Sequence, residues 1–269
     1  MEAAVEYTFS EDVPAPPLST VPGDAQACLE CTVSMDSVRA TKLLCDAGMK
    51  PAVLNFAHGY NCGGGFEHAS GSQEEDIFRK TSVFLSLWPH RREDDGPGVL
   101  KRGTWIGDFD DALPRQKAFY PHAPCGGVFS PNVRFVSRIG EPPARNKEDT
   151  RPIELSASSF GVITVAAQDC GREPPFRPSL LRQKIRTVLY IAARNSCDSV
   201  VFGLFGCGYF RNPPAEVATA FKELLQGEFA GIFRAALCAV PFGGREFEAH
   251  FPPVTPEKVA KLLGVRESL

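Results

Sequence analysis

Short apolar runs that alternate with amphipathic helical segments are the feature of this sequence that most constrains its fold. Residues 160–167 and 200–205 are rich in β-branched and aromatic side chains, which is typical of strands covered on both faces. Residues 178–196, between them, repeat apolar side chains at helical spacing. Further strands are predicted at 28–34, 52–57, 128–136 and 233–242, and further helices at 35–48, 73–88 and from 214 and 255. The segment 128–136 is expected to form one or two short strands interrupted at Pro131. The alternation predicts an α/β fold of three layers, in which helices cover both faces of a mixed, mostly parallel central sheet.

The length of the chain and the distribution of prolines indicate one principal domain. A chain of 269 residues can form one sizeable α/β domain or two small ones. Residues 9–24 contain four prolines and few large apolar groups, so they are predicted to be irregular and exposed. We find no internal repeat and no convincing linker beyond them. We therefore expect an irregular segment at 1–24 and a single domain at 25–269.

Charge and apolar patterning exclude several classes of function. The formal net charge is −3, which gives no electrostatic basis for binding duplex nucleic acid or a membrane surface. The first residues lack a basic segment followed by an apolar run, and no apolar run approaches the roughly 20 residues that span a bilayer. We expect a soluble intracellular protein, cytoplasmic or nuclear, that binds neither membrane nor duplex nucleic acid.

Nine cysteines are scattered along the chain, and several of them lie in apolar segments. In an intracellular protein they are expected to be reduced thiols. Cys28 and Cys31 form a CxxC pair, but no second pair or histidine pair follows at zinc spacing. We therefore expect packing roles for these thiols, and no metal site.

A glycine-rich loop joins one predicted strand to the helix that follows it. Its three consecutive glycines, at 63–65, allow backbone N–H groups to approach a ligand closely. After seven intervening residues, Gln73, Glu74 and Glu75 open the helix. Ser72 and Glu75 also have the spacing of a capping box, in which the two side chains would serve only the helix N-terminus. Capping explains Glu75 but not the glycines, so both interpretations stay open.

A second glycine-containing loop follows a later predicted strand and precedes a helix. Its backbone offers the N–H groups of Gly206, Cys207, Gly208 and Tyr209, an arrangement that suits a phosphate or diphosphate. Ligands of α/β sheets bind beyond the carboxyl ends of the strands, and both loops are predicted to open on that edge. Neither loop matches the dinucleotide-binding or P-loop patterns. A tight turn that is glycine-rich for its own geometry is the alternative.

Several motifs of the chain occur in the same order as in a known protein family. They are Asn55-Phe56-Ala57, the glycines at 63–65 spaced seven residues from Gln73-Glu74-Glu75, Ser130-Pro131-Asn132-Val133, Val165-Ala166-Ala167, Gly206-Cys207-Gly208-Tyr209-Phe210 and Asn212-Pro213-Pro214. This order resembles the poly(ADP-ribose) glycohydrolase family, and looks most like its compact bacterial and fungal branch. The resemblance runs from about Cys31 to Phe242. It implies a macrodomain-like fold, ADP-ribose as ligand or product, and no cofactor.

The resemblance also assigns roles to residues. It implies that Glu75 is the catalytic acid and base, that Glu74 contacts the ribose hydroxyls, and that Phe210 packs on the ribose or adenine. The predicted substrate-binding residues are Asn55, Asn61, Gly63, Gly64, Gly65, Gln73, Gly206, Cys207, Gly208, Tyr209 and Phe210. The chain departs from the family pattern at Cys62, where proline is usual, and at His58, where small or amide residues are usual. A loop at 89–127 also differs from the pattern.

The predicted function is hydrolysis of the ribose–ribose O-glycosidic bonds of poly(ADP-ribose), with poly(ADP-ribose) or ADP-ribosylated protein as the partner. Glu75 would protonate the departing oxygen and then deprotonate water. One alternative is a hydrolase of the same fold that removes single ADP-ribose units from protein or nucleic acid. A non-catalytic ADP-ribose-binding module and an unrelated nucleotide-binding α/β protein are the others.

Overall fold

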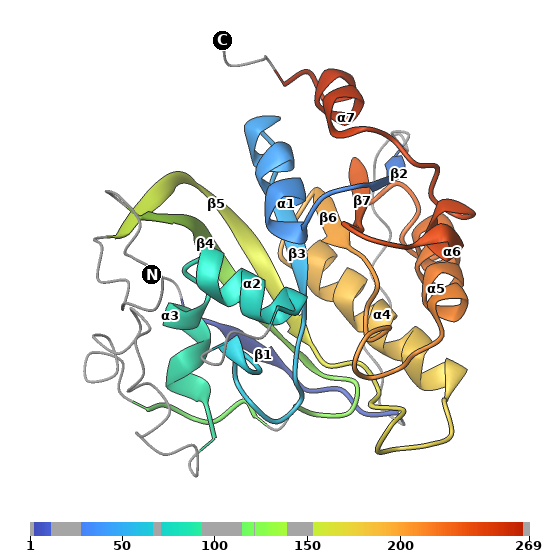
Figure 1. Cartoon of the computed structure of the whole chain (residues 1–269). Helices are drawn as coiled ribbons and strands as arrows, with labels where there is room; N and C mark the ends of the chain where they lie inside the picture. The colour runs from blue at the N-terminus through green and yellow to red at the C-terminus, as the bar shows by residue number, and fades with distance from the viewer. Residues whose placement is uncertain are drawn as a thin grey trace.

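The computed structural model describes residues 3–11, 28–66, 71–92, 115–120, 122–138 and 153–265. Its strands form one sheet with the order β1-β4-β5-β3-β6-β7-β2 (Figure 1). The strands are β1 (Val5–Tyr7), β2 (Leu29–Val33), β3 (Pro51–Phe56), β4 (Gly127–Arg138), β5 (Ile153–Val165), β6 (Ser199–Phe202) and β7 (Ala235–Ala239). The helices are α1 (Ser37–Asp46), α2 (Gln73–Lys80), α3 (Phe84–Leu87), the short 3-10 helix η2 (Trp88–His90), α4 (Pro178–Arg194), α5 (Pro214–Gln226), α6 (Arg245–Glu248) and α7 (Pro256–Leu262).

Most strand pairs of the sheet are parallel. β3 pairs in parallel with both β5 and β6, and β7 pairs in parallel with both β6 and β2. β4 is antiparallel to β5 and to β1, which forms one edge of the sheet. The prediction of a mixed, mostly parallel sheet is therefore confirmed. Because β3 and β6 are adjacent and parallel, the loops that follow them open on the same edge, as the sequence indicates.

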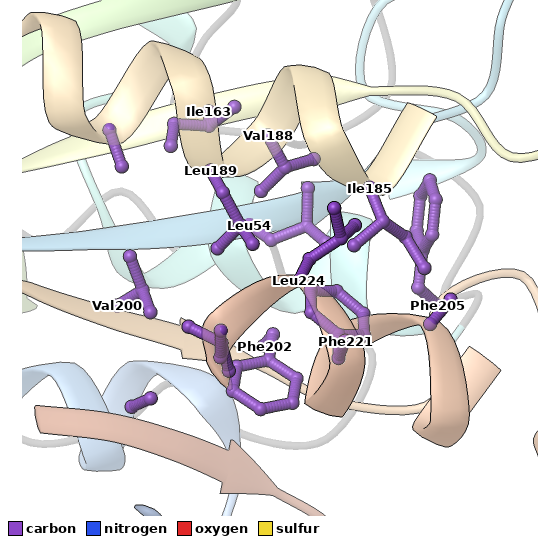
Figure 2. Packing of buried hydrophobic residues seen from close by; sticks show 14 of the residues in the cluster. Leu54, Ile163, Ile185, Val188, Leu189, Val200, Phe202, Phe205, Phe221 and Leu224 are labelled. Carbon is purple, nitrogen blue, oxygen red and sulfur yellow. The ribbon is translucent and has the colours of Figure 1, made fainter. Parts of the chain in front are cut away.

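Side chains of the central strands alternate between two apolar cores, one on each face of the sheet. Leu54 of β3 packs in the cluster that contains α4 and α5, whereas Val53 packs in the cluster that contains α1 and α2. Figure 2 shows the first of these cores, where Ile185 of α4 and Leu224 of α5 lie close to Leu54. Alternate residues of a strand point to opposite faces, so a strand with both faces apolar is covered twice. The three-layer arrangement follows, with helices on both sides of the sheet (Figure 1).

The helix predicted at 73–88 is two separate helices, α2 and α3. Between them Thr81 is extended, with φ −138° and ψ 164°, and forms an isolated β-bridge with Phe135. Its hydroxyl donates to the carbonyl oxygen of Ile77 at 2.8 Å. Ile77, Thr81 and Phe84 are nevertheless all 0% exposed. The apolar stripe in the sequence therefore marks burial correctly but not a continuous helix.

Two other expectations are corrected by the sheet. Val5–Tyr7 pairs with β4 as strand β1, so this part of the segment 1–24 is not irregular, while residues 12–24 lie outside the described residues. The interruption expected at Pro131 does not divide the strand; it is a shift of register between Ser130 and Val133 within β4. Residues 93–114 and 121 of the loop at 89–127 also lie outside the described residues. Among the helices that are described, none combines the length and apolar character needed to cross a membrane.

Candidate active site

The loops that follow β3 and β6 border a cleft of about 610 Å³. All of the predicted site residues line this cleft except Asn55, Gly63 and Cys207. Its lining is formed by Phe56, His58, Asn61, Cys62, Gly64, Gly65, Phe66, Ser72, Gln73, Glu74, Glu75, Trp88, Leu204, Gly206, Gly208, Tyr209 and Phe210. Residues far apart in the sequence therefore meet in one cavity, at the edge of the sheet where the sequence predicts a ligand site.

Gln73 fixes the first turn of α2 to the end of β3. Its Oε1 accepts the Phe56 N–H at 2.9 Å, while its Nε2 donates to Leu54 O at 2.6 Å and to Ser37 Oγ at 3.1 Å. The side-chain amide thus satisfies two backbone groups of β3 that would otherwise need other partners. Gln73 borders the cleft as predicted, but its amide is engaged with the protein. Its place in the structure is to position the two carboxyl groups that follow it.

Glu74 borders the cleft although it is only 2% exposed. Its Oε2 accepts the His58 N–H at 2.8 Å, and its Oε1 lies 3.4 Å from Asn55 Nδ2. Burial, with a smaller contribution from the charge of Glu75, outweighs these donors and raises the pKa of Glu74 to about 8. This carboxyl group is therefore mostly protonated at neutral pH, which makes it both a hydrogen-bond donor and an acceptor.

Glu75 is bound by the glycine-rich loop and by the side chain of Ser72, and not by the backbone at the start of its own helix. Its Oε1 accepts the Gly65 N–H at 2.9 Å, and the Ser72 hydroxyl donates to its Oε2. Ser72 stands at the N-cap position of α2 but makes no side-chain hydrogen bond to a helix N–H. The capping-box explanation is therefore wrong. Glu75 is held at the cleft by the backbone of the loop, which is the arrangement expected of a functional carboxyl group.

The consecutive glycines are required because their backbone passes against the two carboxyl groups. Gly64 has φ +58°, and a Cβ atom there would lie 2.7 Å from Glu75 Oε1 and 2.8 Å from Glu74 Oε2. Gly63 has φ +78°, and its Cβ would lie 2.7 Å from the ring of Phe78. Real Cβ atoms do not approach neighbours so closely, and positive φ is itself unfavourable for other residues. The carboxylates and the glycines therefore form one packed unit.

The loop after β6 presents backbone donors to the cleft. Four N–H groups of this loop have no hydrogen-bond partner in the described part of the chain. They belong to Gly206, Gly208, Tyr209 and Phe210. The Cys207 N–H, also predicted to be a ligand donor, instead donates to Leu204 O at 3.0 Å. Free N–H groups in a loop that leads into a helix are suited to an anion. Of the four predicted N–H donors, those of Gly206, Gly208 and Tyr209 have no partner in the described protein, whereas that of Cys207 is engaged; the Phe210 N–H was not predicted as a donor.

The same loop is tied to the segment that follows strand β5. Asn212 Nδ2 donates to Gln168 O at 2.7 Å and to Gly206 O at 3.1 Å. Gly206 has φ +70°, and a Cβ atom there would lie 2.4 Å from Ala167 Cβ. The glycine is therefore needed for close contact between the loops that follow β5 and β6.

Aromatic rings form the walls of the cleft. Phe66 and Trp88 meet edge to face with their ring centroids 6.1 Å apart. Across the cleft, the ring of Phe210 lies 6.2 Å from that of His58, and Tyr209 is 76% exposed. Flat apolar surfaces of this kind suit the faces of a ribose or a purine.

Asn55 lies behind the carboxyl groups and not at the cleft surface. It is 0% exposed in β3, and its Nδ2 is 3.4 Å from both Glu74 Oε1 and Thr164 Oγ1. The structure thus places Asn55 where it can orient Glu74.

The CxxC thiols of Cys28 and Cys31 do not line this cleft. All nine cysteines are free, and burial raises the pKa of Cys28 to about 12 and that of Cys31 to about 11. These two groups therefore stay protonated at neutral pH. In the parts of the chain that the structure describes, no three His, Cys, Asp or Glu side chains are grouped so as to hold a metal ion.

The similarity to a known family includes the carboxyl pair and the glycine-rich loop. The sequence model described as "Microbial-type PARG, catalytic domain", where PARG is poly(ADP-ribose) glycohydrolase, matches residues 5–94. This span contains Gly64, Glu74 and Glu75. Over this span the chain is similar to the catalytic domain of microbial-type poly(ADP-ribose) glycohydrolases.

Solved PARG structures share the fold over most of the chain. PARG from Thermomonospora curvata is 21% identical over 92% of this chain and 85% of its own, with a TM-score of 0.64. PARG from Deinococcus radiodurans in complex with ADP-ribose is 27% identical over 84% of this chain and 85% of its own, with a TM-score of 0.56. No curated protein matches the sequence. The macrodomain-like fold implied by the resemblance is thereby confirmed.

Sequence patterns alone do not assign several of the cleft residues to a PARG-type site. These residues are Phe56, His58, Cys62, Phe66, Ser72, Trp88 and Leu204. Most of them adjoin a predicted site residue in the sequence, which is the only signal that could have found them. Two of them, His58 and Cys62, are the positions at which the chain departs from the family pattern.

Proposed function

We propose that the chain is a poly(ADP-ribose) glycohydrolase, which cleaves the ribose–ribose O-glycosidic bonds of poly(ADP-ribose) and releases ADP-ribose. The observation that carries the proposal is the meeting of two unlike groups in one cleft. The carboxyl pair of Glu74 and Glu75 lies in the same cavity as the unpartnered N–H groups of the loop after β6. A diphosphate fits the N–H groups, and the ribose attached to it would reach the carboxyl pair.

Glu75 has the role of acid and base in the proposed reaction. It donates a proton to the departing ribose oxygen while positive charge develops at the anomeric carbon, and the bond from that carbon to the oxygen breaks. It then accepts a proton from the water that attacks the same carbon. Its Oε1 contact with the Gly65 N–H holds the carboxylate in place through both steps. The nearby diphosphate would stabilise the cationic centre electrostatically.

Glu74 has a supporting role that its burial makes possible. Because burial raises its pKa to about 8, the carboxyl pair enters the reaction with a proton already bound. A neutral Glu74 can donate to one ribose hydroxyl oxygen and accept from another hydroxyl. The proton on Glu74 is also a reservoir next to Glu75. This is why we assign Glu74 to substrate contact and Glu75 to proton transfer.

The test is a comparison of the native protein with Glu75→Gln on two substrates. Poly(ADP-ribose)-modified protein and a protein carrying single ADP-ribose units are incubated with each variant, and products are identified by gel and mass spectrometry. The native protein is expected to release ADP-ribose from the polymer. Glu75→Gln is expected to lose at least ~100-fold in turnover, since general acid–base catalysis contributes on that order or more, while ADP-ribose binding is retained.

Other outcomes would change the proposal in defined ways. Removal of single units without cleavage of polymer would identify a mono-ADP-ribosyl hydrolase. Binding of ADP-ribose with neither substrate cleaved would identify a binding module. If Glu75→Gln kept more than a few per cent of the native activity, proton transfer would have to be assigned elsewhere, and Glu74→Gln would be the next variant to assay.

A further inference from the structure

His58 occupies a position between the carboxyl pair and the loop after β6. Its backbone N–H donates to Glu74 Oε2 at 2.8 Å, and its ring centroid lies 6.2 Å from that of Phe210. It lines the cleft and also a neighbouring cavity of about 490 Å³, and Phe210 is the other residue common to both. The His58 ring therefore lies in the same cleft as the carboxyl pair and next to the second loop.

The protonation of the His58 ring is fixed by its own loop. Nδ1 lies 3.1 Å from the Asn61 backbone nitrogen and 3.2 Å from that of Tyr60, so it accepts from both N–H groups. A nitrogen that accepts hydrogen bonds cannot carry a proton, so a neutral ring must carry its proton on Nε2. Protonation of Nδ1 would break both contacts. The loop therefore favours one tautomer of neutral imidazole.

The groups around the ring also favour the neutral form. Burial is the largest cause of a lowered pKa at His58, and the positive charge of Arg172 adds to it, while Asp169 and Glu75 act in the opposite direction. Glu74, whose own carboxyl group is mostly protonated at neutral pH, contacts the His58 backbone and not the ring. At neutral pH the ring is therefore an uncharged donor of defined orientation.

The Nε2–H group of His58 donates no hydrogen bond within the described protein. No described residue forms a hydrogen bond with His58 Nε2. This atom is also absent from the fully buried side-chain nitrogen and oxygen atoms that lack a partner, so it is not enclosed by protein. It is consequently accessible from the cavities that His58 lines. An oriented, accessible donor between a sugar site and a diphosphate site is a feature that loop capping through Nδ1 does not require.

We propose that His58 is a substrate-binding residue whose Nε2–H donates a hydrogen bond to an oxygen of the bound ADP-ribose unit, between the ribose at Glu75 and the diphosphate at the second loop. This inference rests on the proposed function and extends it to a position where the chain departs from the family pattern. His58 does not transfer a proton in this role, because a neutral Nε2–H is far too weak an acid. It contributes to substrate affinity and orientation.

The test separates the two nitrogens of the ring. In His58→Asn, the side-chain oxygen can still accept from the backbone N–H groups two and three residues ahead, as in an Asx turn. The Nε2–H donor at the far end of the imidazole ring is lost. His58→Ala loses both. We expect His58→Asn to unfold near the native temperature, to bind ADP-ribose about tenfold more weakly, and to show about a tenfold higher KM on poly(ADP-ribose) with kcat changed less than about threefold. His58→Ala is expected to lose affinity and thermal stability together.

A spectroscopic measurement keeps the proposal open to refutation whatever the variants do to the loop. In ¹⁵N-labelled protein with native His58, Nε2 should carry the proton and Nδ1 should not, and the Nε2–H resonance should shift when ADP-ribose is added. Unchanged affinity and KM in a folded His58→Asn protein, or an Nε2–H resonance that ADP-ribose does not move, would overturn the proposal. Either result would leave the glycohydrolase function standing if the native protein still cleaves polymer.

Discussion

At the scale of single residues, Gly64 is the position where the fold and the site are least separable. Replacing it with alanine places a Cβ atom 2.7–2.8 Å from the carboxylate oxygens of Glu74 and Glu75, at a φ of +58°. We expect Gly64→Ala to lose about 1–2 kcal/mol from the backbone conformation alone. We also expect activity to fall by about 100-fold, because displacement of a reacting group by about 1 Å has an effect of that order.

The measurement for Gly64 is the rate of polymer cleavage together with a urea unfolding curve. Gly71→Ala is the matched control, because a Cβ atom at Gly71 meets nothing within 4 Å and Gly71 has no positive φ. The control should keep native stability and activity. If Gly64→Ala were as active as Gly71→Ala, the carboxyl groups would not depend on close contact with the glycine backbone.

Most of the residues that line the cleft could be predicted from the sequence, but not what each side chain bonds to. The spacing of the glycines and Glu75 pointed to a ligand site, whereas the equally good capping-box spacing of Ser72 and Glu75 was misleading. A spacing rule describes what a helix end permits, and it does not include a loop N–H such as that of Gly65 competing for the same carboxylate. Gln73 was placed at the cleft correctly, but its bonds to β3 depend on tertiary geometry.

At the scale of secondary-structure elements, the Gln73 side chain connects α2 to β3. Gln73→Met keeps the length of the side chain but leaves the Phe56 N–H and Leu54 C=O groups without their present partner. Unsatisfied buried polar groups cost about 1–3 kcal/mol each, so we expect a loss of about 2 kcal/mol or more in the free energy of unfolding. Activity should fall as well, because the first turn of α2 carries both carboxyl groups.

The matched control for this prediction is Gln226→Met, at the exposed last residue of α5. The same substitution there should change the free energy of unfolding by less than about 0.5 kcal/mol. Equal urea midpoints for the two variants would show that the amide bonds of Gln73 do not hold α2 to the sheet.

Helices and strands that follow from local sequence periodicity were predicted better than those that depend on contacts with distant residues. The helix α4 and the strands β3, β6 and β7 follow from periodicity and apolar runs, because each of them buries the faces that the pattern marks. The break at Thr81 could not be read from the pattern. It arises because Thr81 bridges to Phe135, a residue more than fifty positions away, while the stripe of buried residues continues. Strand β1 likewise owes its place to pairing with β4.

At the scale of the whole molecule, buried ionisable groups give folding stability two opposite dependences on pH. His58, His90 and His122 have pKa values lowered chiefly by burial, to about 4 for His122. Their contribution is fully present above the unfolded value near 6.5 and is lost as the pH falls through the folded values. Glu74 acts in the other direction, because burial raises its pKa to about 8. Its contribution is fully present below about 4.5 and is lost as the pH rises through 8.

The alkaline limb of this profile can be assigned to a single residue with Glu74→Gln. Glutamine keeps the shape of the side chain and cannot ionise, so the variant avoids the cost of a buried charge. Its free energy of unfolding, relative to that of the native protein, should rise with pH between about 4.5 and 8 by at most ~1.4 kcal/mol per pH unit, and then level off. Urea midpoints for both proteins at pH 5.5, 7 and 8.5, with equal slopes, provide the measurement. A difference that stays constant over this range would mean that Glu74 is ionised throughout. The proposed proton reservoir beside Glu75 would then have no basis.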